Sequence, residues 1–178
     1  MKSTRNGFLF LLGGAIAGAV SATLAIDIAG SAPAAGGSAW RVWERTSATD
    51  ADPYALAHFL LQGNLPPPAP LVAEYYRARD DEGERLSTNC TYELAGPSPE
   101  ARWWGLTAGA DGLSGQMTSA ETVVDPSGRL RIRLSRHPQA ENWLELPDAG
   151  SFELKFTVAG TGTGDPPAPR FSMSRIEC

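Results

Sequence analysis

Apolar and polar residues alternate with a period of two along several stretches in the C-terminal part of this chain. In "RLRIRL", residues 129–134, the leucines and the isoleucine share one face of an extended strand and the arginines share the other. The alternation recurs in "CTYEL" at 90–94 and "FELKFTV" at 152–158, and more weakly in "RFSMSRIEC" at 170–178. Turn signals separate these stretches: "DDEG" at 80–83, "GADG" at 109–112, "DPSG" at 125–128 and "PDAG" at 147–150. The pattern predicts a mainly β protein, an antiparallel β-sandwich that resembles a jelly roll.

One helix is expected before these strands. In "DPYALAHFLLQG", residues 52–63, Asp52 suits the N-cap, Pro53 suits the first helical position and Gly63 suits the stop. Its apolar positions fall on one helical face: Leu56, Ala57, Phe59 and Leu60. We expect this helix to pack on the sheet.

The N-terminal residues form a long uncharged segment. No charged residue occurs from Asn6 to Ile26, and about 20 helical residues cover the hydrocarbon core of a bilayer. Lys2 and Arg5 precede the segment and Asp27 follows it, so the positive-inside rule keeps the N-terminus in the cytoplasm. Residues 1–29 are therefore expected to anchor the chain by a single pass through the inner (plasma) membrane. The rest would lie outside the cytoplasm, in the periplasm if the cell is Gram-negative.

A cleaved signal peptide is the alternative for this segment. The small residues Gly30, Ser31 and Ala32 have the spacing that a signal peptidase prefers. The apolar run is longer than the usual signal core, which favours a retained anchor. Residues 30–39, "GSAPAAGGSA", are expected to be a flexible linker, and residues 40–178 suit a single extracytoplasmic domain.

The charge of the chain bears on its partners. The formal net charge is −5 at pH 7, so no overall basic field would attract nucleic acid. The expected partners are the membrane, through the N-terminal helix, and either an envelope protein or a small-molecule or lipid ligand.

The chain has two cysteines, Cys90 and Cys178. Because the expected topology places both in a compartment where disulfides persist, we predict that they form a disulfide bond. Two buried free thiols are the alternative.

The order of several motifs resembles a known family. The motifs are "AEYYRARDDEGERLS", "CTYEL", "ARWWGLT", "DPSGRLRIRLS" and "ENWLELPDAGSFELKF". Together they resemble the bacterial domain of unknown function 1214, in its short membrane-anchored form, over about residues 50–178. The matching positions are Tyr75, Tyr76, Asp80, Gly83, Trp103, Trp104, Leu106, Thr107, Asn142, Trp143, Leu144, Pro147, Phe152 and Leu154. The resemblance implies a β-sandwich and a cell-envelope setting, and it implies no reaction.

Two adjacent tryptophans raise the question of a ligand site. In a strand, Trp103 and Trp104 point to opposite faces, and Trp104 shares its face with Leu106. We therefore place Trp104 in the core. For Trp103 two interpretations stand: the segment "WRVW" at 40–43 and the helix cover it, or it lines a shallow apolar groove with Trp143 for a lipid, glycan or small molecule.

Arg129, Arg131 and Arg133 form a short basic stripe on the polar face of their strand. Such a stripe can hold an anionic headgroup or the carboxylates of a partner. The alternative is a solvated sheet face on which the arginines pair with Glu93, Glu145 or Glu153 across strands.

No motif predicts catalysis, a metal site or a cofactor. His58 and His137 have no ligand-like spacing, and "GLSGQ" at 112–116 lacks the pattern of a nucleophile elbow. The acidic stretch "RDDEGE" at 79–84 is expected to be a charged turn, with a calcium site as its alternative. The leading hypothesis is a non-catalytic, membrane-anchored binding module. A structural or assembly protein of the envelope is the alternative, followed by a hydrolase-type enzyme without a recognisable motif.

Overall fold

The computed structural model describes residues 2–34, 39–43, 51–65, 71–110, 113–160 and 168–178. These residues contain two helices, α1 (Lys2–Gly30) and α2 (Pro53–Leu61), and ten strands. The strands are β1 (Ser31–Pro33), β2 (Arg41–Trp43), β3 (Val72–Arg77), β4 (Thr91–Pro97), β5 (Trp103–Ala110), β6 (Leu113–Thr118), β7 (Arg129–Ser135), β8 (Trp143–Glu145), β9 (Glu153–Ala159) and β10 (Ser172–Glu177). The chain divides into two compact units, Met1–Ala32 with Trp43–Pro66 and Pro33–Val42 with Pro67–Cys178.

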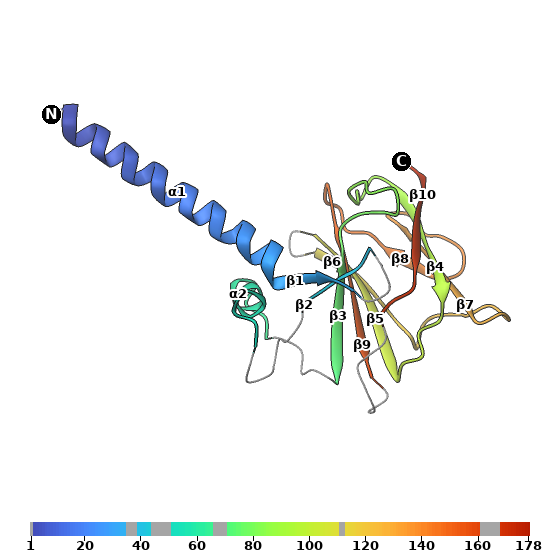
Figure 1. Ribbon diagram of the computed structural model, residues 1–178. Helices are drawn as coiled ribbons and strands as arrows, with labels where there is room; N and C mark the ends of the chain where they lie inside the picture. The colour runs from blue at the N-terminus through green and yellow to red at the C-terminus, as the bar shows by residue number, and fades with distance from the viewer. Residues whose placement is uncertain (1, 35–38, 44–50, 66–70, 111–112, 161–167) are drawn as a thin grey trace. The chain divides into compact units, whose positions relative to one another are not determined.

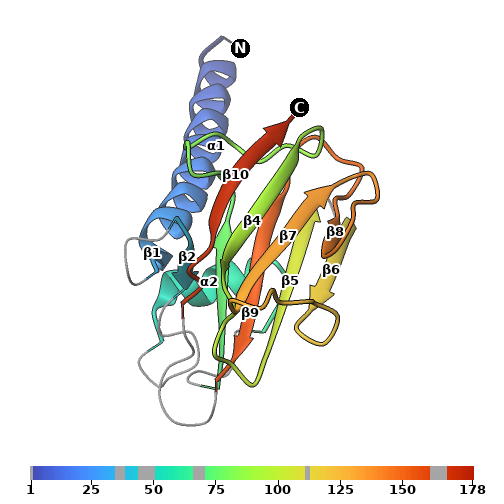
Figure 2. The same cartoon turned by 90° about the vertical axis from the view of Figure 1, so that its right-hand side faces the viewer.

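Two sheets make up the larger unit (Figure 1). The six-stranded sheet has the order β1-β2-β3-β9-β5-β6, and the four-stranded sheet has the order β10-β4-β7-β8. Figure 2 shows the four-stranded sheet lying in front of β9, β5 and β6. The pairs of β4 with β7 and β10, and of β9 with β3 and β5, are antiparallel, whereas β7 and β8 pair in parallel. The predicted mainly β, sandwich-like fold is confirmed.

The inner faces of the two sheets form one hydrophobic core. The four-stranded sheet contributes Tyr92, Leu94, Leu130, Ile132 and Leu134, and the six-stranded sheet contributes Trp104, Leu106, Leu154, Phe156 and Val158. The Phe156 ring lies 5.7 Å from those of Trp104 and Phe171 and 6.1 Å from that of Trp40. Trp104 is therefore a core residue, as its alternation with Trp103 predicts.

The smaller unit contains α1 and α2. Asp52 caps α2, because its Oδ1 accepts hydrogen bonds from the backbone of Tyr54 at 2.8 Å and of Ala55 at 3.2 Å. Gly63 follows the helix with φ of 69°, as a helix stop requires. The His58 ring stacks on Trp43 at 3.7 Å within the same unit. The expectation that α2 packs on the sheet stays a prediction.

Helix α1 is long and apolar enough to cross a membrane. Its segment Asn6–Gly30 has a mean hydropathy of 2.1, which a signal sequence would also satisfy. Ser31–Pro33 form strand β1 directly after α1, although a flexible linker was expected over residues 30–39. Ala34 N donates a hydrogen bond to Trp40 O at 2.8 Å, which joins the two sides of this segment. Residues 35–38 lie outside the described part of the chain.

The last strand, β10, is fastened to the sandwich at its outer edge. The Sγ atoms of Cys90 and Cys178 lie 2.11 Å apart, at disulfide-bonding distance. Asp80 accepts a hydrogen bond from Arg175 at 2.7 Å, and Asp81 accepts one from the Met173 amide at 2.7 Å. These contacts tie β10 to the acidic turn.

That turn has the form expected from the sequence. Gly83 has φ of 86°, and Asp80 Oδ1 accepts a hydrogen bond from the Glu84 amide at 2.8 Å. The carboxylates of Asp80 and Asp81 are engaged by Arg175 and Arg77. The acidic stretch is therefore a structural turn in which two of the carboxylates, those of Asp80 and Asp81, form ion pairs.

At the opposite edge of the four-stranded sheet, β8 approaches the six-stranded sheet closely. A Cβ atom at Gly115 in β6 would lie 2.0 Å from the carbonyl oxygen of Glu145 in β8. Only glycine allows this contact, because such an overlap would force the backbone apart.

We predict that Gly115→Ala lowers the free energy of unfolding by about 2 kcal/mol, because its Cβ would collide with the backbone of β8. Urea unfolding of the full chain in detergent, followed by tryptophan fluorescence, measures the change. Gly109→Ala in β5 is the matched control, since its nearest new contact would be an ordinary 4.0 Å. Equal losses in the two variants would contradict the close approach.

Candidate functional site

Within the described residues, a cleft lies at each end of β8. The first, here called the arginine cleft, has a volume of about 450 Å³ and precedes the strand. Its walls come from Arg129 and Arg131 of β7, from Glu141 and Asn142, and from residues 123–126. The second, the edge cleft, has a volume of about 360 Å³ and follows β8.

Asn142 holds the arginine cleft together. Its side chain is 6% exposed; its Oδ1 accepts a hydrogen bond from Val123 N at 2.7 Å. Its Nδ2 donates to Val123 O at 2.7 Å and to Arg131 O at 2.8 Å. One carboxamide therefore satisfies three backbone groups and ties the segment at Val123 to β7.

The residue before Asn142 has an unusual backbone. Glu141 has φ of 64°, in the left-handed region that a glutamate rarely adopts. Such a conformation costs about 1 kcal/mol or more and persists where neighbouring contacts hold it. Here the side-chain hydrogen bonds of the next residue, Asn142, hold the backbone in place. Glu141 lines the cleft.

Asp125 organises the turn that carries Arg129. Its Oδ1 accepts hydrogen bonds from the Ser127 amide at 2.8 Å, the Ser127 hydroxyl at 2.6 Å and the Arg129 amide at 2.9 Å. These hydrogen bonds, that of the Ser127 hydroxyl foremost, hold the pKa of the Asp125 carboxyl below its ordinary value. Asp125 is therefore ionised at neutral pH, and attraction between its charge and the Arg131 guanidinium is a smaller cause of the same lowered pKa.

The three arginines of the basic stripe differ in their partners. Arg133 forms an ion pair with Glu93 at 3.1 Å, and the two residues are directly opposite in the β4–β7 register. Among the residues that the structure describes, the guanidinium groups of Arg129 and Arg131 make no ion pair or side-chain hydrogen bond. The expected pairing with glutamate thus holds for Arg133, and the other two arginines face the cleft.

The structure does not bring Trp103 and Trp143 together. Trp143 is in register with Arg133 on the four-stranded sheet, and its Nε1 donates to Ser135 O at 3.0 Å. Trp103 lies on the six-stranded sheet, on the face opposite Trp104. Each indole directly precedes a buried, inward-facing residue, Trp104 or Leu144, so it lies on the outer face of its own sheet. Because the sheets differ, the two indoles line no common groove.

Trp103 is 41% exposed, and its ring lies over Gly105, where a Cβ would come within 2.9 Å of it. Trp40, which was expected to help cover it, is buried in the core beside Phe156, and cover by Trp43 and the helix stays a prediction. The Trp103 indole therefore packs on the outer face of the six-stranded sheet, over Gly105.

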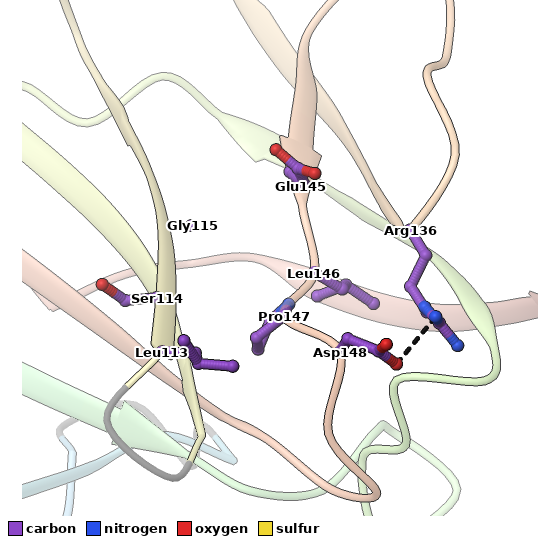
Figure 3. A pocket seen from close by; sticks show the side chains of 8 residues that line it. All are labelled: Leu113, Ser114, Gly115, Arg136, Glu145, Leu146, Pro147 and Asp148. Carbon is purple, nitrogen blue, oxygen red and sulfur yellow. Dashed lines mark ion pairs between the residues drawn. The ribbon is translucent and has the colours of Figure 1, made fainter.

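Figure 3 shows the edge cleft between β6 and the segment after β8. Leu113 and Pro147 point toward each other across it, and Arg136 pairs with Asp148 at 2.7 Å. Both partners of this ion pair are substantially exposed, so it contributes little to stability. The lining of the edge cleft combines apolar Leu113, Leu146 and Pro147 with this ion pair and with the Glu145 carboxylate.

Sequence reasoning missed Asn142, Glu141 and Val123 as site residues. Asn142 had a signal, because it begins the "NWLELP" motif quoted for the family resemblance. Glu141 stands directly before Asn142 in the same stretch but is not one of the matching positions, and Val123 lies outside all of these motifs. The roles of both depend on the fold around β8. Among the described residues, no group of three His, Cys, Asp or Glu side chains is placed to hold a metal ion.

The family described as "Protein of unknown function (DUF1214)" matches residues 72–163. This chain belongs to the DUF1214 family. The match runs from the start of β3 past the end of β9, so it includes the linings of both clefts. The resemblance to the family is thereby confirmed over residues 72–163, the membrane-anchored form stays a prediction, and the family description names no reaction.

Two solved structures resemble this DUF1214 protein. The VPA0106 protein from Vibrio parahaemolyticus is 14% identical with a TM-score of 0.58, over 72% of this chain and 36% of that one. An uncharacterized protein from Burkholderia cenocepacia is 18% identical with a TM-score of 0.50, over 60% of this chain and 30% of that one. The chain thus spans about a third of the length of either structure, and the likeness shows the fold alone. No curated protein matches the chain.

We predict that Asn142→Ala lowers the free energy of unfolding by about 3 kcal/mol, because three part-buried hydrogen bonds to the backbone are lost. Hydrogen exchange at the Val123 amide should accelerate in parallel, since the Asn142 oxygen is its acceptor. Asn89→Ala, at an exposed position, is the control and should leave both measurements unchanged. Unchanged hydrogen exchange at the Val123 amide in the Asn142 variant would contradict the role given to these hydrogen bonds.

The adjacent tryptophans provide a matched pair. Trp104→Ala should lower the free energy of unfolding by about 4 kcal/mol through cavity formation, and Trp103→Ala by about 1 kcal/mol. The ratio follows from their exposed fractions, 3% for Trp104 and 41% for Trp103. Thermal unfolding of both variants measures it, and a larger loss for Trp103 would show that the outer indole is covered.

Proposed function

We propose that this DUF1214 protein is a membrane-anchored extracytoplasmic module that binds a small-molecule or lipid ligand, without catalysis, in the arginine cleft. The observation that carries the proposal is a cleft of about 450 Å³ in which two arginine side chains face the opening without an ion-pair partner among the described residues. Unpaired cations beside apolar surface are suited to recognising a ligand.

The local geometry supports binding by a prearranged site. Asn142 bonds to the backbone of Arg131, and Asp125 bonds to the backbone of Arg129. A site held by such contacts needs little ordering when a ligand arrives, which favours affinity. The residues that line this cleft supply charge, amide and apolar surface, and none of them is a Ser, Cys or His nucleophile.

The proposed location rests on the N-terminal segment and on the cysteines. Helix α1 is long enough to span, and the charges of Lys2 and Arg5 before it favour a cytoplasmic N-terminus. A Cys90–Cys178 pair at bonding distance suits an oxidising compartment outside the cytoplasm. We therefore place the chain in the inner (plasma) membrane with its sandwich in the periplasm or its equivalent.

Native mass spectrometry of the full chain, extracted from its own membranes in mild detergent without reductant, tests the proposal. We expect the mass of the uncleaved chain, less two hydrogens for the disulfide, with an additional bound molecule. A shortened N-terminus would refute the anchor, and a full complement of thiol hydrogens would refute the oxidising location.

Val123→Trp separates the arginine cleft from other binding places. Val123 is 73% exposed on the wall of the cleft, so an indole there should obstruct the opening without disturbing the core. The bound molecule should be lost from this variant and retained by Leu113→Trp in the edge cleft. Retention by the Val123 variant, or a bare wild-type chain, would contradict the proposed function.

A further inference from the structure

We infer that the ligand of the arginine cleft carries an oxyanion, a phosphate or carboxylate group, bound between Arg129 and Arg131 with an apolar portion against Val123 and Val124. The inference rests on the proposed function and assigns the chemistry of the same cleft. Four observations carry it: the spacing of the arginines, their fixed backbones, the state of the nearby carboxylates and the apolar wall.

Arg129 and Arg131 are two residues apart on one strand and lie on its outer face, because Leu130 between them is buried. Their Cα atoms are therefore about 6.7 Å apart, which lets two long side chains converge on one group. Guanidinium groups bind phosphate and carboxylate oxygens through paired N–H donors. The arrangement suits one oxyanion shared by both arginines.

The carboxylates near these arginines do not neutralise them by contact. Asp125 uses Oδ1 for three hydrogen bonds within its own turn, and it attracts Arg131 electrostatically without forming an ion pair with it. Glu141 lines the cleft, and the structure gives it no ion pair with either arginine. Its negative charge would repel an anion, which makes Glu141 a residue that limits affinity for an oxyanion.

The remaining wall is apolar. Val123 and Val124 are 73% and 38% exposed, and Pro126 lies beside them in the cleft. Exposed valines next to two arginines without ion-pair partners favour a ligand in which a charged group is attached to a short apolar part.

The experiment measures the binding of n-butyl phosphate to the full chain in nanodiscs of phosphatidylcholine, by isothermal titration calorimetry at low ionic strength. Wild type should bind saturably. Arg131→Gln and Arg129→Gln should each weaken binding about tenfold, because each removes a charge-assisted contact. Glu141→Gln should strengthen binding about threefold by removing repulsion.

Arg133→Gln is the matched control. Arg133 has the same charge, strand and face, and differs in being paired with Glu93. Its substitution should leave the affinity for butyl phosphate within about twofold of wild type, as expected for a charge already neutralised. An equal loss in all three arginine variants would overturn the inference, since general surface charge would then account for binding.

Nanodiscs that contain phosphatidylglycerol distinguish a lipid headgroup from a soluble anion. Competition of this lipid with butyl phosphate would identify the headgroup as the source of the oxyanion, and no competition would identify a soluble molecule. The absence of saturable binding to either probe would overturn the inference. If native mass spectrometry then found an uncharged ligand that Val123→Trp displaces, the proposed function would stand without the oxyanion.

Discussion

One buried carboxamide, that of Asn142, determines the shape of the candidate site. It bonds to backbone atoms of Val123 and Arg131, which lie 19 and 11 residues away along the chain. The same segment is also joined to β7 by the bridge between Val124 and Leu130. The Asp125 amide adds a hydrogen bond to Arg129 O at 2.9 Å, so the carboxamide extends these links to Val123. One wall of the cleft therefore depends on several backbone contacts with β7, and the side chains of Arg129 and Arg131 project from that strand.

Contacts at both edges of the four-stranded sheet, at β10 and at β8, stabilise the sandwich that carries the cleft. At one edge, the cysteine pair and the acidic turn hold β10 in place. Beside them, Arg77 donates hydrogen bonds to the carbonyl oxygens of Arg79 at 2.7 Å and Phe171 at 3.4 Å. Arg77 is buried, so each of its bonds offsets the cost of removing a charge from water. At the other edge, Gly115 lets the backbone of β8 come against β6. These contacts are of different kinds, and all of them join the two sheets or secure an edge strand.

The outer face of β7 shows how one repeating pattern can have two uses. Arg133 lies opposite Glu93 in register and is paired, so it contributes to a solvated sheet face. Arg129 lies opposite Pro97 and Arg131 opposite Ala95, so the neighbouring strand offers them no charge. Alternation alone makes the three arginines equivalent, and the register of β4 makes them different. That difference is the physical basis for the proposal that the arginine cleft binds a ligand.

The sequence by itself determined the local features of this protein. Period-two alternation identified β7 and β9, the Asp52 and Gly63 signals identified α2, and the parity of Trp104 placed it in the core, because each depends on neighbours along the chain. The order of motifs from Tyr75 to Leu154 also predicted the family. Only the tertiary structure decided that Trp103 and Trp143 lie on different sheets, that β8 pairs in parallel with β7, and that Asn142 reaches Val123. Those outcomes depend on which strands become neighbours and in which register, and these are set by packing between residues distant in the chain, which a local pattern does not encode.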